Sequence, residues 1–195
     1  MKLVSINSDY APVSNSINAA IVSDACFPGQ VFSQSFTRFS FLTFDELLMP
    51  DFFIKLVRFQ RAIGEESFWF SCIEPDPRLY FNEHFDFFGC VEFAVEDEAE
   101  EYCNALNNFP ETSLADALAH SANQIVILSQ SGKWAIYGNR DSEIAICAFR
   151  DFSSQDVFQS IYGDDLFPNA ESAFNFAYGE CANEGKGLFL ENYST

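Results

Sequence analysis

Uninterrupted apolar runs mark the centre of the chain. Three of them follow one another, and none alternates with polar residues, which is typical of strands that are covered on both faces. The connections between the runs are short and rich in turn residues, and links of that length join antiparallel neighbours. We therefore predict a central three-stranded antiparallel meander over about residues 124–149, in which Trp134 is buried. The three runs are 125–128, 134–137 and 144–149.

Further strands are indicated before the meander. Residues 90–95 alternate between apolar and polar side chains, which predicts a half-buried strand. The segments 67–73 and 31–41 are rich in aromatic residues, which favours strands over helices. Residues 17–22 fit either a short strand or a turn of helix.

Helical spacing of apolar residues and capping signals predict six helices. Thr43 and Glu46 form a capping box, and Asp51 and Asn169 are expected to cap two other helices. Ser113 is expected to open a helix that buries Leu114. The six predicted helices span about 44–49, 51–63, 97–108, 113–120, 153–161 and 169–181.

The order of these elements predicts the fold class. Strands and helices are only partly interleaved, and a meander lies in the middle, which favours an α+β fold with an antiparallel sheet packed by helices. The 24 phenylalanines need large flat surfaces to pack on, although a surplus of rings could also form an exposed patch. We expect a single domain over residues 1–195; a small N-terminal lobe over 1–64 is the alternative.

The charge is the strongest compositional signal. The formal net charge is −19, and the segment 79–132 holds ten acidic residues and no Lys or Arg. Such a field repels nucleic acid and anionic membranes and attracts basic proteins. An acidic surface that serves only solubility is the alternative reading of the same charge.

Several features indicate a cytoplasmic protein. The start has no apolar run of signal-peptide length, and no stretch approaches the roughly 20 apolar residues of a membrane span. The six cysteines include no Cys-x-x-Cys pair, so we expect reduced core residues rather than a disulfide framework or a zinc site. No cofactor is expected, and the oligomeric state is left open. The cysteines are Cys26, Cys72, Cys90, Cys103, Cys147 and Cys181.

A long aromatic segment over residues 78–89 is the candidate binding site. It is expected to be an extended loop in which aromatic and acidic residues are interleaved, and long aromatic loops are often functional. Aromatic anchors with a carboxylate rim suit a basic protein partner, because rings supply contact area while charges steer the encounter. We predict Tyr80, Phe85 and Phe87 as anchors. The expected rim is Glu83, Asp86, Glu98 and Glu101.

Catalytic signatures are scarce in the sequence. It lacks the Gly-x-Ser-x-Gly, Gly-x-Gly-x-x-Gly, Walker and His-Glu-x-x-His patterns. The best remaining group is Glu83, His84 and Asp86, with Cys72 or Cys90 as a thiol nucleophile, which would make a small hydrolase. We expect a non-catalytic protein and keep this hydrolase as the alternative. A structural protein of an acidic assembly is a third alternative.

The segment 132–146 supplies a family resemblance. Its sequence, Gly-Lys-Trp-Ala-Ile-Tyr-Gly-Asn-Arg-Asp-Ser-Glu-Ile-Ala-Ile, combines a tryptophan hairpin, a Gly-x-Arg-Asp turn and an apolar strand. It resembles small bacterial immunity proteins that are encoded beside polymorphic toxins. The resemblance implies a cytoplasmic, non-catalytic protein that neutralises a toxin by binding it, and the acidity suits a basic, nuclease-like toxin.

Overall fold

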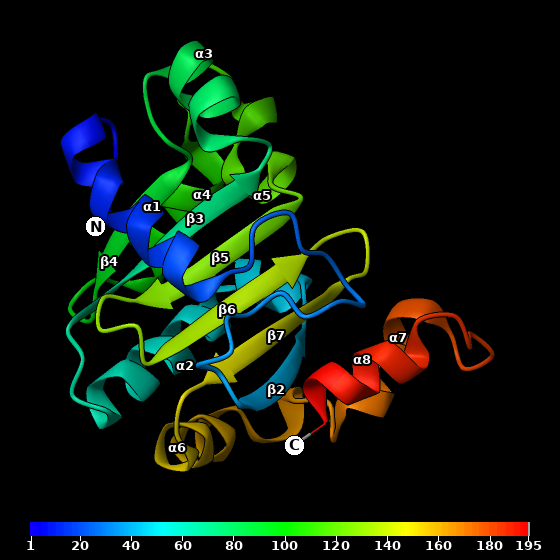
Figure 1. Cartoon of the computed structure of the whole chain (residues 1–195). Helices are drawn as coiled ribbons and strands as arrows, with labels where there is room; N and C mark the ends of the chain where they lie inside the picture. Colours follow the sequence, from blue (N-terminus) through cyan, green and yellow to red (C-terminus); the bar gives the residue numbers. More distant parts are fainter. Residues whose placement is uncertain (195) are drawn as a thin grey trace.

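The fold of residues 1–194, given by a computed structural model, is built on a seven-stranded sheet (Figure 1). The strands lie in the order β1-β4-β3-β5-β6-β7-β2, and every neighbouring pair is antiparallel. The bounds are β1 Lys2–Leu3, β2 Arg38–Thr43, β3 Ser67–Glu74, β4 Cys90–Ala94, β5 Gln124–Ser129, β6 Trp134–Asn139 and β7 Ile144–Phe149.

The meander forms the middle of the sheet, as predicted. β5, β6 and β7 are consecutive in the sheet order, and Ile136 of β6 pairs with Ile127 on one side and Cys147 on the other. Trp134 is only 1% exposed, which confirms its burial. The antiparallel sheet packed by helices confirms the α+β class.

Helices and loops cover both faces of the sheet. Along β6, Trp134 and Ile136 point into one apolar core, whereas Ala135 and Tyr137 point into a second core on the opposite face. In Figure 1, α1 lies across one face of the sheet and α2 lies behind it. Two covered faces explain why the central strands are apolar without alternation. The first core is closed by α2 (Pro50–Ala62), α4 (Ala99–Asn108), α5 (Leu118–Ser121) and α6 (Phe152–Tyr162), and the second by α1 (Asn7–Ala20), α7 (Ala170–Tyr178) and α8 (Lys186–Tyr193).

The two cores absorb most of the phenylalanines. Nineteen of the 24 are buried, and among residues 1–194 only Phe152 and Phe176 are largely exposed. Neither of these two lies in the segment 78–89. The high phenylalanine content therefore reflects a doubly covered sheet more than a ring-rich surface.

The N-terminal third differs from the sequence prediction. Residues 7–20 form α1 although Pro12 lies inside it, because Tyr10, Val13 and Ile17 recur at helical spacing and are buried against the sheet. The predicted strand 31–41 is shorter and shifted, since β2 covers only Arg38–Thr43. β2 pairs with β7 along its whole length, which makes it part of the same sheet.

The first two predicted helices, 44–49 and 51–63, are also corrected. α2 begins at Pro50, where proline suits the first turn because its missing N–H needs no partner, so Asp51 is not the cap. The segment expected to be a helix over 44–49 is the short 3₁₀ turn η1 (Asp45–Leu48). Glu46 accepts a hydrogen bond from the Thr43 N–H at 3.2 Å, which is one half of the predicted capping box.

The later helices are confirmed in part. Asn169 caps α7, since its side chain accepts from the Ser172 N–H at 2.8 Å. The predicted helix 113–120 is instead split into the 3₁₀ turn η3 (Leu114–Asp116) and the single turn α5, and Leu114 is 58% exposed rather than buried. No element was predicted after residue 181, but the structure has the helix α8 there. A further 3₁₀ turn, η4, spans Gly163–Asp165.

The turn between β6 and β7 is structural. The Arg140 guanidinium donates to the Ala119 and Ala122 carbonyl oxygens at 2.8 and 2.9 Å, which ties the turn to α5. Gly138 lies in β6 beneath η1, where an added Cβ would sit 2.6 Å from a Leu47 methyl carbon. The glycine is therefore needed for close packing rather than for a left-handed turn conformation.

The cysteines divide into three groups by exposure, and Cys103 alone is half-buried. Cys72, Cys90 and Cys147 are buried in the cores, as expected of reduced cysteine. Cys26 and Cys181 are exposed, which corrects the expectation that all six are core residues.

Candidate functional site

The segment 78–89 is helical rather than an extended loop. Asp76 opens it, because one carboxylate oxygen accepts from the Arg78 and Leu79 N–H groups at 2.7 and 2.8 Å. A π-helical stretch, η2 (Pro77–Asn82), runs directly into the single turn α3 (Glu83–Phe85). Asp86 ends this turn in the left-handed conformation, with φ of 58°.

Packing turns several aromatic rings of this segment inward. Phe81 and Phe88 are fully buried, and Phe88 stacks on Tyr10 of α1 at a centroid distance of 4.3 Å. Phe87 is only 5% exposed, so its prediction as an exposed anchor is wrong; its ring packs edge-on against Phe81. Tyr80 and Phe85, the other two predicted anchors, are half-buried.

A hydrogen bond fixes η2 against η3. The Tyr80 hydroxyl donates to the Asp116 carboxylate, which also accepts from the Ser113 hydroxyl. These two bonds, from Ser113 and then Tyr80, lower the pKa of Asp116 below its ordinary value, with a smaller contribution from the nearby His84. The segments 76–89 and 110–121 therefore form one surface, called the acidic end below.

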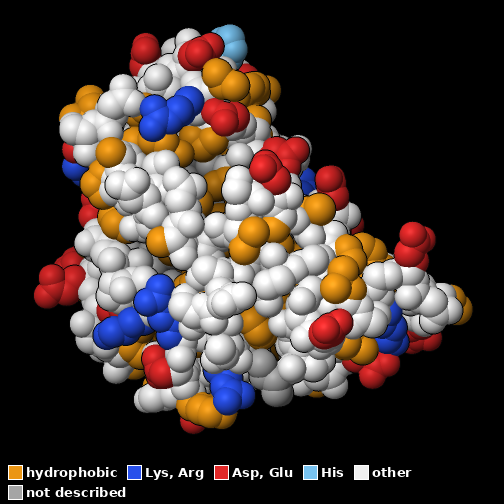
Figure 2. Space-filling model, viewed as in Figure 1, with side chains coloured by type: hydrophobic (Ala, Val, Ile, Leu, Met, Phe, Trp, Pro, Cys, Tyr) orange, Lys and Arg blue, Asp and Glu red, His pale blue; other side chains and the backbone are white. Residues whose placement is uncertain are grey.

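The acidic end exposes two leucines among carboxylates. Leu79 is 64% exposed, more than any other large apolar side chain of residues 1–194, and Leu114 is 58% exposed. Figure 2 shows acidic, apolar and imidazole side chains together on the end of the molecule that α3 forms. The acids of this end are Asp76, Glu83, Asp86, Glu111 and Asp116, against the single arginine Arg78.

Arg78 does not neutralise these carboxylates directly. Its guanidinium donates to the Asn7 side chain at 3.3 Å and lies over the ring of Tyr10 at 5.3 Å, on the α1 side of the segment. Sequence reasoning missed both exposed leucines. Leu114 carried a helical signal that predicted burial, and Leu79 carried no signal because its exposure depends on the π-helical turn.

The other predicted rim residues lie elsewhere. Glu98 and Glu101 begin α4, beyond the C-terminal end of β4, whereas the segment 76–89 of the acidic end leads into the first residue of β4, so the length of the strand lies between them. Glu101 accepts from the Glu98 N–H at 2.9 Å and thereby caps α4. Glu83 and Asp86 are exposed at the acidic end, as expected of rim residues. The structure thus brings together only part of the predicted rim.

The hydrolase constellation is not assembled. His84 and Asp86 are exposed, while both thiols proposed as nucleophiles are buried. Burial raises the pKa of Cys90 to about 12 and that of Cys72 still further, so neither is a ready thiolate near neutral pH. Within residues 1–194, no three His, Cys, Asp or Glu side chains are grouped so as to hold a metal ion.

Comparisons with protein-family models, curated proteins and solved structures gave no match. In the part of the chain that the structure describes, no helix has the length and apolar character needed to span a membrane.

Proposed function

We propose that this chain is a non-catalytic binding protein that neutralises a basic protein, such as a nuclease-like toxin, in the cytoplasm. The observation that carries the proposal is the acidic end, where exposed Leu79 and Leu114 stand among five carboxylates. Apolar side chains inside a polar rim are the usual anatomy of a protein-binding surface.

The arrangement suits a basic partner for two physical reasons. The carboxylates create a negative field that steers positively charged surfaces towards this end, and the net charge of −19 extends the field over the molecule. The leucines then supply area that leaves water only when the partner docks. The Tyr80–Asp116 bond holds the two halves of the surface together before binding, which lowers the ordering cost.

The resemblance of the β6–β7 hairpin to toxin-immunity proteins points in the same direction. In this protein the hairpin lies at the centre of the sheet, with Trp134 and Tyr137 buried, so it serves the fold. We therefore propose the acidic end, and not the hairpin itself, as the binding surface.

The test begins with the products of neighbouring genes, each purified and assayed for binding by surface plasmon resonance. A binding toxin domain is then measured against the variant Glu83→Gln/Asp86→Asn/Glu111→Gln, in which asparagine keeps the left-handed backbone of residue 86 accessible. We expect association to slow about tenfold at low salt and to depend less on salt. A matched control, Glu180→Gln/Glu184→Gln/Glu191→Gln, removes three exposed charges near the C-terminus and should associate at nearly the parental rate.

Two further results bear on the proposal. Leu79→Ser/Leu114→Ser should speed dissociation while leaving association nearly unchanged, since contact area acts mainly on the dissociation rate. If the control variant slows association as much as the acidic-end variant does, the effect is one of total charge and the acidic end is not the contact surface. If no neighbouring gene product binds, neutralisation of an adjacent toxin is excluded.

A further inference from the structure

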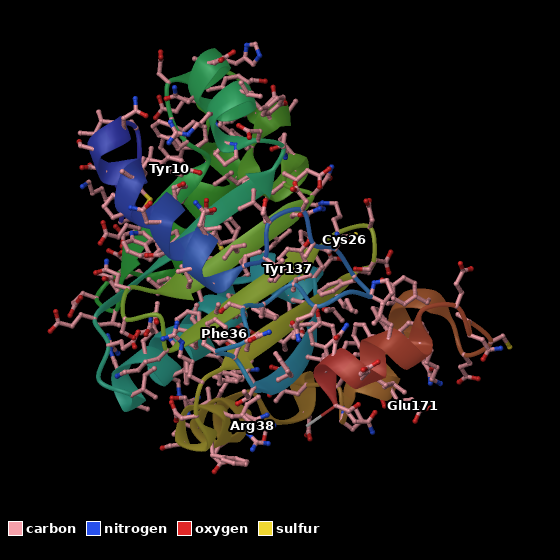
Figure 3. All side chains as sticks on the ribbon, viewed as in Figure 1. Tyr10, Cys26, Phe36, Arg38, Tyr137 and Glu171 are labelled. Atoms are coloured by element: carbon pink, nitrogen blue, oxygen red, sulfur yellow. The ribbon has the colours of Figure 1, made fainter. Side chains whose placement is uncertain are left out.

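A cleft opens beside the acidic end, between α1, the segment 21–26 and the end of β3. Its volume is about 500 Å³. Its apolar wall is formed by Ile17, Ile21 and Ile73. In Figure 3, Tyr10 projects from α1, Tyr137 comes from β6, and Cys26 lies in the segment that follows α1. All three line the cleft.

The cleft contains a buried hydroxyl without a partner. Tyr137 is 0% exposed, and no donor or acceptor of residues 1–194 completes a hydrogen bond with its oxygen. Burial raises the pKa of Tyr137 to about 12. The nearby Asn139 side chain partly opposes this rise, although it completes no hydrogen bond with the hydroxyl. Tyr137 lines the cleft together with Cys26 and Glu74. A buried polar group left unpaired is costly, and a ligand atom can relieve that cost.

The polar side chains of the cleft favour a cation. Asp24, Glu74 and Asp76 line it, and none of its lining residues is Lys or Arg. Glu74 is held in place because it accepts a hydrogen bond from the Gln124 side chain, another lining residue. A donor-rich cationic group between Glu74 and Tyr137 would satisfy the hydroxyl oxygen as an acceptor and pair with the carboxylate at once.

We propose that this cleft binds a ligand that carries a guanidinium or ammonium group on a short aliphatic stem. The cation donates to Tyr137 and pairs with Glu74, while the stem lies against the apolar wall that Ile17, Ile21 and Ile73 provide. The carboxylates of Asp24 and Asp76 draw the cation in at low salt. This proposal does not rest on the proposed function, because it requires no protein partner, although Asp76 lies in both the cleft and the acidic end.

The first test is a titration of the isotope-labelled protein with agmatine, followed by amide chemical shifts. We expect saturable shifts confined to the residues that line the cleft, around 17–26, 73–77, the Gln124 side chain and Tyr137. Tyr137→Phe removes only the hydroxyl, and Glu74→Gln removes only the charge; each should weaken agmatine binding about tenfold. Glu191→Gln, which removes an exposed acid outside the cleft, should bind as the parent does.

A second measurement uses the two exposed thiols as reporters. Agmatine should slow alkylation of Cys26, which lines the cleft, and leave alkylation of Cys181, which lies outside it, unchanged. A neutral analogue of similar length, butylurea, should protect neither thiol. Mass spectrometry of the modified peptides gives both rates in one experiment.

The outcomes separate the sources of the cation. If a capped Gly-Arg-Gly peptide binds at least as tightly as agmatine and responds to the same two variants, the cleft takes an arginine side chain; if only agmatine binds, it takes a small free amine. The proposal is overturned if agmatine produces no saturable shifts at millimolar concentration, or if Tyr137→Phe and Glu74→Gln bind it as the parent does. Because no toxin enters these assays, their failure leaves the proposed function to be judged by its own test.

Discussion

Replacement of Trp134 by alanine tests whether the meander is the core of the fold. Trp134 begins β6 and is 1% exposed, with its ring edge-on to Phe59 of α2 at 5.7 Å and near Phe68 of β3 at 6.4 Å. It therefore joins the central strand to a neighbouring helix and to another strand. Truncation at this position leaves a large cavity between sheet and helix, which the surroundings can fill only in part.

The size of the effect follows from two opposing contributions. Burial of an aromatic side chain of about 200 Å² stabilises by about 5 kcal/mol at roughly 25 cal/mol per Å². The indole N–H is buried without a hydrogen-bond partner among residues 1–194, and its removal returns about 1 kcal/mol. We expect Trp134→Ala to lower the free energy of unfolding by about 4 kcal/mol and the melting temperature by about 10 °C.

Far-UV circular dichroism in urea measures this change, since tryptophan fluorescence is itself altered by the substitution. Trp134→Phe is the matched control: it keeps most of the ring volume and removes the unpaired N–H, so it should cost less than about 1.5 kcal/mol. The reasoning is refuted if the alanine variant loses less than about 1 kcal/mol, or if phenylalanine costs as much as alanine.

Three further predictions concern the turn at β6 and the acidic end. Gly138→Ala should destabilise the protein by about 1–3 kcal/mol in urea unfolding, because the new Cβ meets Leu47; a neutral result would mean that η1 moves freely. Arg140→Met should lower the free energy of unfolding by about 2 kcal/mol, since two hydrogen bonds to carbonyl oxygens of α5 and its C-cap are lost while the aliphatic stem is kept. Unchanged hydrogen exchange of the α5 amides would contradict this prediction. Because the pKa of Asp116 is lowered, its contribution to the stability of the fold is present above the ordinary carboxyl pKa and is lost as pH falls through the lowered value. The Asp116 carboxyl carbon should therefore titrate below 3.8 by NMR, and Tyr80→Phe should move the midpoint upward.

The sequence predicted the elements whose signals are local. The unalternating runs of the meander required two covered faces, and the helical period and acidic first turn of α4 placed that helix to within two residues. α1 was missed because Pro12 is a strong breaker signal, and burial of Tyr10, Val13 and Ile17 against the sheet overrides it.

The candidate site was predicted only in part, for a different reason. Alternating aromatic and acidic residues suggested an extended loop, but the Asp76 cap closes residues 77–85 into helical turns and sends Phe87 inward. Exposure of Leu79 and Leu114 depends on how two segments distant in sequence pack together, and the bond between Tyr80 and Asp116 that joins them has no sequence pattern. The cleft at Tyr137 likewise needs α1, β3 and β6 together.

The division of the acids by β4 leads to a last prediction, made with Glu98→Gln/Glu101→Gln. β4 alone spans about 13 Å at 3.3 Å per residue, which exceeds the roughly 8 Å over which exposed charges act at physiological salt. Replacement of these two acids should therefore leave the rate of association with a basic partner at the acidic end unchanged. The double substitution should instead lower the free energy of unfolding by about 1 kcal/mol, because both carboxylates stabilise the N-terminus of α4. If this pair slows association as much as Glu83→Gln/Asp86→Asn does, the partner contacts both ends of β4 and the binding surface is larger than the acidic end.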